Sequence, residues 1–219
     1  MADSLFTADE HQRIADAVAE AERQTAGEIV PYVVARSGQY DVATWKAASG
    51  GALLAALFAL AFAYFYDGWG LGWLYTGWAM VLVMTLGGTL GALLALIEPV
   101  RRWLAGSDRM AQQVHRRASM AFLDEEVFDT RDRTGILLFV SLMEHRIEVL
   151  GDTGINAKVE PEDWVEVVAL MRDGIRSGDL AGGMVRGIGK CGELLHRRGV
   201  EIREDDTDEL HDGVRVREE

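Results

Sequence analysis

Two long apolar stretches decide the organisation of this chain of 219 residues. The first, Ala47–Tyr66, reads AASGGALLAALFALAFAYFY, and the second, Trp73–Ile97, reads WLYTGWAMVLVMTLGGTLGALLALI. Neither contains a charged residue or a histidine, and a helix needs about 20 apolar residues to cross the hydrocarbon core of a bilayer. The sequence therefore predicts two transmembrane helices. The short Gly-rich linker between them, Asp67–Gly72, allows only a helical hairpin.

The two apolar stretches have two alternative interpretations besides membrane spans. A pair of buried core helices would need far more protein to cover helices of this length and apolarity. A cleaved signal peptide is excluded because the first apolar stretch starts late in the chain and a second one follows it. Membrane spans remain the favoured interpretation, with the lipid bilayer as a partner.

The positive charges predict the orientation of the hairpin. Arg36 and Lys46 precede the first span, and Arg101 and Arg102 follow the second, whereas the linker has no basic residue. Basic residues mark the cytoplasmic side of a span, and aromatic residues near the linker place it at the other surface. We therefore expect two spans in the cell inner (cytoplasmic) membrane, with both termini and the polar domain cytoplasmic.

Small residues line the expected spans. Gly87 and Gly91 are four residues apart, and a row of alanines runs through the first stretch. Such faces allow close helix contact, either within the hairpin or in a homodimer through Gly87 and Gly91. The spans carry no titratable side chain, so the sequence offers no proton or ion relay inside the membrane.

The rest of the chain is very polar. The 51 residues from Ala47 to Ile97 carry one charge, Asp67, so 56 of the 57 Lys, Arg, Asp and Glu side chains lie in the other 168 residues. The net charge of −13 argues against nucleic acid as a partner, because phosphate binding needs clustered cations. The single cysteine, Cys191, excludes an intramolecular disulfide framework and a Cys-rich zinc site.

Helices and strands alternate in this polar part. A capping box, Thr7 to Glu10, starts a helix that is expected to run to about Gln24. A strand is expected at 28–35, in which Pro31 indicates an edge position or a bulge. A helix is expected from Pro99 to about Leu123 with Trp103, Val114, Ala118 and Phe122 facing inward, although its first part, which is rich in Arg and carries Trp103 and Leu104, could lie on the membrane surface. The remaining expected elements are a buried strand at 135–142, a strand at 146–150 that forms a hairpin with it, a turn at 151–154, a helix after Pro161 and a last helix from Leu180 to about Arg198.

The predicted order has consequences for domain organisation. The strands at 28–35 and 135–142 must share one sheet, so the transmembrane hairpin interrupts a single α/β domain. We expect the first part of the domain at 5–40, the hairpin at 47–97 with spans at 47–66 and 73–97, and the second part at 99–199. The tail at 200–219 is rich in acids and poor in large apolar residues, and is expected to be disordered.

The motifs that carry chemistry are few. Residues 187–192 match G-x-G-x-x-G, but no strand precedes them, and close helix packing explains the glycines better. Asp129, Asp132 and Asp152 stand at strand ends, where carboxylates and backbone carbonyls could bind Ca²⁺ weakly. The alternative is a solvated rim of ion pairs with the nearby Arg131, Arg133 and Arg146. No catalytic and no cofactor-binding residue can be assigned.

Several segments, taken in order, resemble one known family. They are TAGEIV at 25–30, RTGILLFVS at 133–141, RIEV at 146–149, GDTGI at 151–155 and Trp164. Together they resemble a TPM domain, in the membrane-protein branch in which two spans interrupt the domain after its first strand. The resemblance implies an α/β/α sandwich with a small central sheet, interrupted by the transmembrane helical hairpin.

The resemblance implies a range of functions. Members of the family are linked to phosphatase activity, divalent-cation binding, photosystem repair and accessory roles for membrane proteins. We therefore expect a membrane-anchored cytoplasmic module, noncatalytic, that assists the assembly or repair of other membrane proteins. The alternative is a phosphatase-like hydrolase or a divalent-cation-binding domain. In a hydrolase, Arg131, Arg133 and Arg146 could bind phosphoryl oxygens, although no nucleophile stands out.

Overall fold

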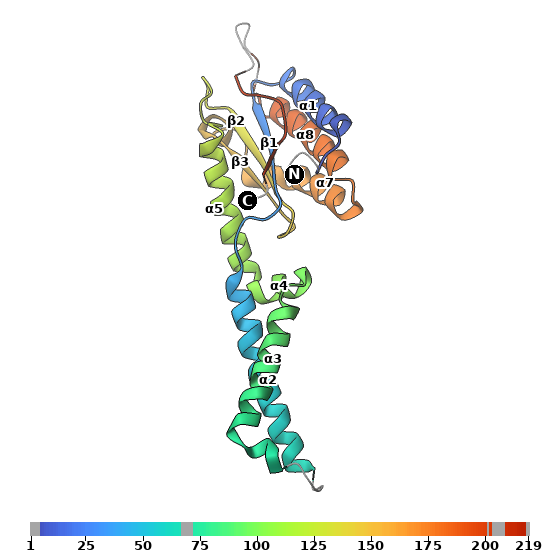
Figure 1. Ribbon diagram of the computed structural model, residues 1–219. Helices are drawn as coiled ribbons and strands as arrows, with labels where there is room; N and C mark the ends of the chain where they lie inside the picture. The colour runs from blue at the N-terminus through green and yellow to red at the C-terminus, as the bar shows by residue number, and fades with distance from the viewer. Residues whose placement is uncertain (1–4, 67–71, 201, 203–208, 218–219) are drawn as a thin grey trace. The chain divides into compact units, whose positions relative to one another are not determined.

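The computed structural model describes residues 5–66, 72–200, 202 and 209–217, with only the backbone at residues 74 and 75 (Figure 1). The chain forms two compact units. We call residues 1–38 and 111–219 the sheet domain and residues 39–110 the hairpin unit. The second unit therefore interrupts the first in sequence, as an insertion into one α/β domain requires.

The sheet domain is built on a mixed four-stranded sheet in the order β3-β2-β1-β4. Its central strands β1 (Glu28–Val34) and β2 (Gly135–Ser141) are parallel and pair over their full lengths. β3 (Arg146–Gly151) pairs antiparallel with β2, and β4 (Arg215–Arg217) pairs parallel with the end of β1. The predicted sharing of one sheet and the predicted β2–β3 hairpin are both confirmed.

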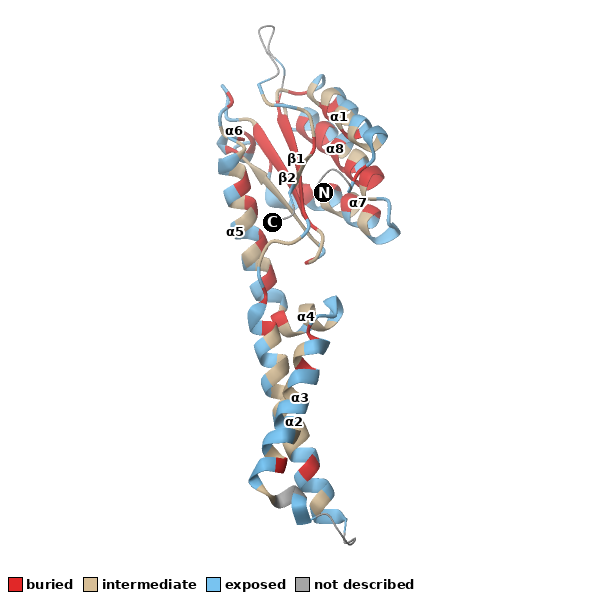
Figure 2. Ribbon diagram, viewed as in Figure 1, coloured by how far each residue is buried: buried red, intermediate tan, exposed pale blue. Residues whose placement is uncertain are grey.

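Helices cover both faces of this sheet. The helices of the domain are α1 (Ala8–Glu22), α5 (Ser107–Asp124), α6 (Thr153–Asn156), the 3₁₀ helix η3 (Pro161–Trp164), α7 (Val165–Ser177) and α8 (Leu180–Arg197). Alternate residues of β1 face opposite sides, so Ile29 and Val33 pack with α1, α7 and α8, whereas Val30 and Tyr32 pack with α5. Figure 2 shows β1 and β2 as the most deeply buried strands.

The predicted starts and packing of the helices follow from identifiable residues. Thr7 and Glu10 form the expected capping box of α1. Gly178 ends α7 in the left-handed conformation that glycine adopts without strain, and Asp179 then caps α8. Within the G-x-G-x-x-G stretch, Gly187 packs on Met171 and Gly192 on Ala21, which confirms helix packing as the role of these two glycines.

The hairpin unit contains α2 (Asp41–Phe65), the 3₁₀ helix η2 (Gly72–Tyr75), α3 (Gly77–Leu94) and α4 (Glu98–Ala105). Both α2 and α3 are long and apolar enough to cross a membrane. α2 begins six residues before the predicted span, at Asp41, and α3 begins four residues after the predicted start because η2 comes first. Most of the expected linker, residues 67–71, lies outside the described residues.

The single helix expected from Pro99 to Leu123 is wrong. Gly106 has φ +84, which no helix accommodates, and it separates α4 from α5. Val114 and Ala118 are buried as expected, and Phe122 is partly buried. Trp103, for which an inward position and a place on the membrane surface were both open, does not face inward: it is 81% exposed because it belongs to α4 and not to the helix that covers the sheet.

Disorder was expected over 200–219, and this expectation is also wrong for residues 215–217. Residues 215–217 form β4, and Val214 and Val216 pack against the core. The tail as a whole is acidic, but residues 214–217 read V-R-V-R, an alternation of apolar and polar residues that suits a strand at the edge of a sheet. β4 pairs with β1 only from Tyr32 onward, so Pro31 occupies a position where β1 pairs with β2 alone, in line with its expected edge position.

Candidate functional site

Asp152, one of the three predicted metal ligands, already has structural partners. It follows β3 directly and caps α6, because its Oδ1 accepts a hydrogen bond from the Thr153 N–H at 2.6 Å. Its Oδ2 forms an ion pair with Arg133, at 2.8 Å from Nε. Among the described residues, this oxygen accepts no hydrogen bond, so Arg133 balances its charge without donating to it. The carboxylate is 6% exposed. The turn expected at 151–154 thus starts a short helix.

Asp129 and Asp132 lie in the loop before β2, and both are exposed. The loop contacts the start of α6: the Gly154 N–H donates to the Arg133 carbonyl at 2.9 Å, and a Cβ at Gly154 would overlap the Asp132 carbonyl. The structure therefore brings the Asp132 and Asp152 segments together while Asp129 stays in solvent. Among the described residues, no group of three or more His, Cys, Asp or Glu side chains is placed to hold a metal ion.

Arg133 joins this loop to the end of β3. Its φ of +58 lies in the left-handed region, which is unfavourable for a residue with a Cβ. The guanidinium compensates for this by pairing with Asp152 and by lying over the Phe128 ring, 5.6 Å from its centroid. One of the three arginines that a phosphatase-like site would need is therefore already paired with a carboxylate.

A buried polar network at the opposite end of the sheet was not predicted. Glu144 is 3% exposed, and its Oε1 accepts a hydrogen bond from the Ser37 N–H at 2.9 Å while its Oε2 accepts one from the Ser141 hydroxyl at 2.5 Å. The Ser37 and Ser141 hydroxyl oxygens are 2.6 Å apart. Since the Ser141 proton goes to Glu144, the Ser37 hydroxyl is the donor in this pair. The sequence showed Glu144 only as one of many charges near the strand hairpin.

This network fixes the segment through which the chain leaves the sheet domain. Ser37 follows β1, and the Met143 N–H donates to the Ala35 carbonyl at 2.9 Å beside it. Ser141 is fully buried, which excludes substrate access to its hydroxyl in this arrangement. We interpret Glu144 as an anchor that holds the exit of β1 against the link between β2 and β3.

The C-terminal segment is held on the domain by charge. Glu125, which directly follows α5, lies 3.3 Å from both Arg215 and Arg217. The Glu125 carboxylate raises the pKa of Arg217, and burial raises the pKa of Tyr32 beside it. At the other end of the segment, the Glu28 carboxylate accepts hydrogen bonds from the Glu209 and Leu210 N–H groups.

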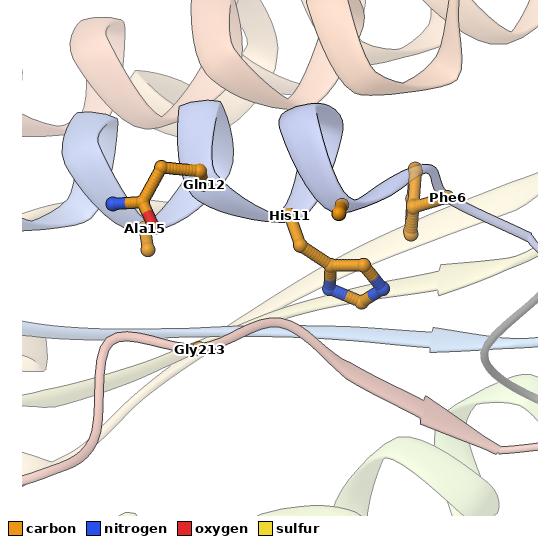
Figure 3. Close-up of a pocket in the computed structure, with 6 residues that line it drawn as sticks. Phe6, His11, Gln12, Ala15 and Gly213 are labelled. Atoms are coloured by element: carbon orange, nitrogen blue, oxygen red, sulfur yellow. The ribbon is translucent and has the colours of Figure 1, made fainter.

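A pocket of about 480 Å³ lies between α1 and the chain that leads into β4 (Figure 3). The imidazole of His11 points from α1 toward the segment around Gly213, and the ring contacts Phe6 edge-on with centroids 5.6 Å apart. Ala8, Gln12 and Ala15 complete the lining. The pocket offers one imidazole and one amide in otherwise apolar surroundings. No pattern in the sequence predicts it.

The hairpin unit exposes its apolar side chains. In an apolar stretch of 18 residues within each helix, the buried share is 6% in α2 and 11% in α3. Figure 2 shows the two helices exposed along most of their lengths. The most exposed large side chains, each above 60%, are Trp45, Leu54, Phe58, Tyr64, Phe65, Trp78, Val81, Leu86 and Trp103. Both helices of the hairpin unit thus combine the length and composition of a membrane span with an exposed apolar surface.

The small residues of the spans are used inside the hairpin. A Cβ at Gly87 would lie 2.6 Å from the Gly51 carbonyl oxygen and would overlap Ala55, and a Cβ at Gly91 would overlap the Ala47 carbonyl. Packing of α2 on α3 therefore accounts for both glycines. A homodimer through Gly87 and Gly91 stays a prediction.

Comparison with known proteins adds a likeness in fold. No protein-family model matches the chain, and no curated protein matches its sequence. The NMR structure of the BA42 protein from the psychrophilic bacterium Bizionia argentinensis is similar, with 19% sequence identity and a TM-score of 0.59 over 97% of this chain and 96% of that chain. At this level of identity the likeness concerns the fold alone.

Proposed function

We propose that this chain is a membrane-anchored, noncatalytic module, in which the α2–α3 hairpin spans the cytoplasmic membrane and the sheet domain is cytoplasmic. The observation that carries the proposal is the exposed apolar surface of α2 and α3. A core helix of a soluble protein buries its apolar side chains, whereas these two helices leave Leu54, Phe58 and Leu86 more than 60% exposed. A bilayer is the surrounding that such side chains prefer.

The proposed role is accessory: the module assists or stabilises other membrane proteins. Its support is the combination of an apolar hairpin without titratable groups in the spans and a sheet domain whose buried polar side chains serve structural contacts. Burial also raises the pKa of the Cys191 thiol, so this cysteine is unsuited to act as a nucleophile. The resemblance to the membrane branch of TPM domains points the same way.

Membrane fractionation tests the anchor. We expect the full chain to stay in the membrane pellet after alkaline carbonate extraction. Phe58→Arg, which puts a charge in the middle of α2, should move a large fraction to the supernatant, whereas Val165→Arg at an exposed site of α7 should not. Release of the unchanged chain by carbonate would contradict the anchor.

Affinity capture from mild detergent tests the accessory role. We expect independent captures to recover the same membrane protein, and we expect that protein to be lost when Gly183→Leu disrupts the sheet domain. Capture of intact, folded chain without any reproducible membrane protein would contradict the role.

A second candidate function is weak binding of a divalent cation, Ca²⁺, near Asp129, Asp132 and Asp152. The observation in its favour is the contact between the Asp132 segment and the start of α6. Carbonyl and carboxylate oxygens are the ligands that Ca²⁺ prefers. An NMR titration decides: resonances of residues 129–132 and 151–154 should move with millimolar Ca²⁺ beyond the effect of matched ionic strength, and their constancy would refute the site.

A further inference from the structure

α4 is a short amphipathic helix that follows the apolar helix α3 almost directly. It begins after Ile97 and ends at Gly106, and it carries one buried side chain, Ala105, beside the strongly exposed Trp103. Arg101 and Arg102 lie in the same helix and are partly exposed. One helix of eight residues thus offers an indole and two guanidinium groups next to the end of an expected span.

Two hydrogen bonds fasten α4 to the ends of the hairpin helices. Arg101 Nε donates to the Ala95 carbonyl at the end of α3, at 3.1 Å. Lys46 Nζ, in the second turn of α2, donates to the Leu104 carbonyl, also at 3.1 Å. Within the hairpin unit, α4 therefore lies across the ends of α2 and α3 at which the chain enters and leaves the unit (Figure 1).

The side chains around this end combine aromatic rings with cations. Trp45 of α2 is 73% exposed and Trp103 of α4 is 81% exposed. Lys46 and Arg102 flank these indoles in sequence, although Glu98 and Asp41 are also present at the same end. Indole rings favour the boundary between acyl chains and headgroups. Lys and Arg beside that boundary attract anionic headgroups.

We propose that α4 lies in the headgroup layer of the membrane, with Trp45 and Trp103 at the interface and Lys46 and Arg102 bound to the phosphate of an anionic phospholipid. The proposal rests on the proposed function, because it requires α2 and α3 to span the same membrane. It adds a lipid class and a site. α4 then sets the depth of the hairpin in the bilayer, since it cannot follow α3 into the acyl chains.

A depth measurement separates the two proposals. Single nitroxide labels are placed on the full chain in the Cys191→Ala background by Leu86→Cys in α3, Trp103→Cys in α4 and Val165→Cys in α7. The labelled chains are reconstituted in nanodiscs of equimolar phosphatidylcholine and phosphatidylglycerol, and relative accessibility to oxygen and to a polar nickel complex gives the depth. We expect residue 86 in the acyl region, residue 103 at headgroup depth and residue 165 in water.

Each outcome has one meaning. If residue 103 lies in water and residue 86 lies in the acyl region, the headgroup position of α4 is contradicted, while the proposal of two membrane spans stands. Residue 86 in water overturns both proposals. If residue 103 lies at the same depth as residue 86, the headgroup position of α4 is also contradicted, because α4 would then continue the membrane span.

The lipid preference has its own test with Trp103 in place. Native mass spectrometry of chains released from the same nanodiscs counts bound phosphatidylglycerol. A cation near an anionic membrane surface contributes about 1 kcal/mol, or about fivefold in affinity, so Lys46→Gln and Arg102→Gln should each reduce retained phosphatidylglycerol by about that factor. Arg176→Gln in α7 is the matched control and should change nothing. Unchanged retention in both test variants would refute the anionic site.

Discussion

The α7–α8 pair of the sheet domain and the α2–α3 pair of the hairpin unit use glycine in the same way and differ on their outer faces. Gly174 and Gly183 let α7 and α8 approach closely, as Gly51 and Gly87 do for α2 and α3. Yet α8 has a buried apolar face, with Met184 and Ile188 fully buried, and a polar face with Arg186 and Glu193 in ion pairs at the surface. α3, and α2 from Ala47 onward, have no charged side chain and so no polar face of this kind.

The comparison shows that close packing does not decide where a helix pair belongs. In both pairs a Cβ at the contact glycine would meet the backbone of the partner helix. What differs is the rest of each helix surface: α8 is amphipathic and one side of it suits water, whereas every side of α3, and of α2 from Ala47 onward, suits hydrocarbon. The apolar exposure, and not the helix contact, is therefore the argument for a membrane.

The largest effect is expected at the glycine contact of the sheet domain. Gly183→Leu forces a side chain into the backbone of α7 around Gly174, and overpacking of this kind costs about 3 kcal/mol or more. Cys191 is the only cysteine and is fully buried, so the urea concentration at which it reacts with a maleimide reports the unfolding of this domain. Gly189→Ala, at an open position of α8, is the control and should be neutral or stabilising. Equal stability of the Gly183→Leu variant would contradict the packing.

The next effect is expected at Glu144. Glu144→Ala removes the acceptor of the Ser37 N–H and of the Ser141 hydroxyl in a buried place, and the lost partners should cost roughly 2 to 3 kcal/mol by the same Cys191 measurement. The exposed Glu162→Ala should stay within about 0.5 kcal/mol of the unchanged chain. If Glu144→Ala and Glu162→Ala have the same unfolding free energy, Glu144 does not anchor the exit of β1.

The glycine contact of the hairpin should be less costly in detergent. Gly87→Leu separates α3 from Gly51 and Ala55, with an expected loss of roughly 1 to 2 kcal/mol in the thermal unfolding of α-helix followed by circular dichroism. Gly50→Ala, with open space around it, is the control. The mass of the detergent-solubilised particle distinguishes the alternatives: a dimer through Gly87 and Gly91 would fall apart in the variant, whereas packing within the hairpin leaves the mass unchanged.

A smaller effect is expected at β4. Arg215→Ala removes a partly buried ion pair with Glu125, and the strand should lose about 1 kcal/mol of local stability. The Ala35 N–H donates to the Arg217 carbonyl, so its hydrogen exchange should quicken about fivefold, as that free energy implies, while the amides of β2 keep their protection. Unchanged exchange at Ala35 would mean that Arg215 does not hold β4.

The smallest effect concerns acid. The Gly182 N–H lowers the pKa of Asp179, and the Glu160 N–H, followed by Arg198, lowers that of Asp163. Their contribution to the stability of the sheet domain is therefore present above the ordinary aspartate pKa and is lost as the pH falls from that value through the lowered folded-state pKa values. Asp179→Asn keeps a capping side chain and should show a slightly weaker loss over this range in urea unfolding; an equal or stronger loss would assign the acid sensitivity elsewhere.

The sequence predicts the fold well where a pattern is local. The capping box of α1, the apolar run of β2 and the β2–β3 hairpin each depend on neighbouring residues, and all three are confirmed. β4 was missed because a three-residue strand becomes favourable only beside the edge of β1 and the carboxylate of Glu125. The break at Gly106 was missed because glycine within a polar helical pattern is ambiguous.

The site was harder to predict than the fold. Asp152 was expected as a metal ligand from its place after a strand, but the sequence cannot show that its Oδ1 accepts a hydrogen bond from the Thr153 N–H or that its Oδ2 forms an ion pair with Arg133. The Glu144 network joins residues more than 100 positions apart, so no local pattern reveals it. By contrast, the lack of charged residues over 47–66 and 73–97 is visible in the sequence itself, so a membrane anchor can be predicted from the sequence alone.

Impermeant thiol labelling in intact cells tests the central claim most directly. In the Cys191→Ala background, Gly72→Cys lies next to the expected outer turn and Val165→Cys lies on the exposed surface of α7. The account predicts that a membrane-impermeant maleimide labels residue 72 in intact cells and labels residue 165 only after the membrane is permeabilised. Labelling of both residues in intact cells, or of neither until permeabilisation, would contradict a hairpin that spans the membrane with the sheet domain in the cytoplasm.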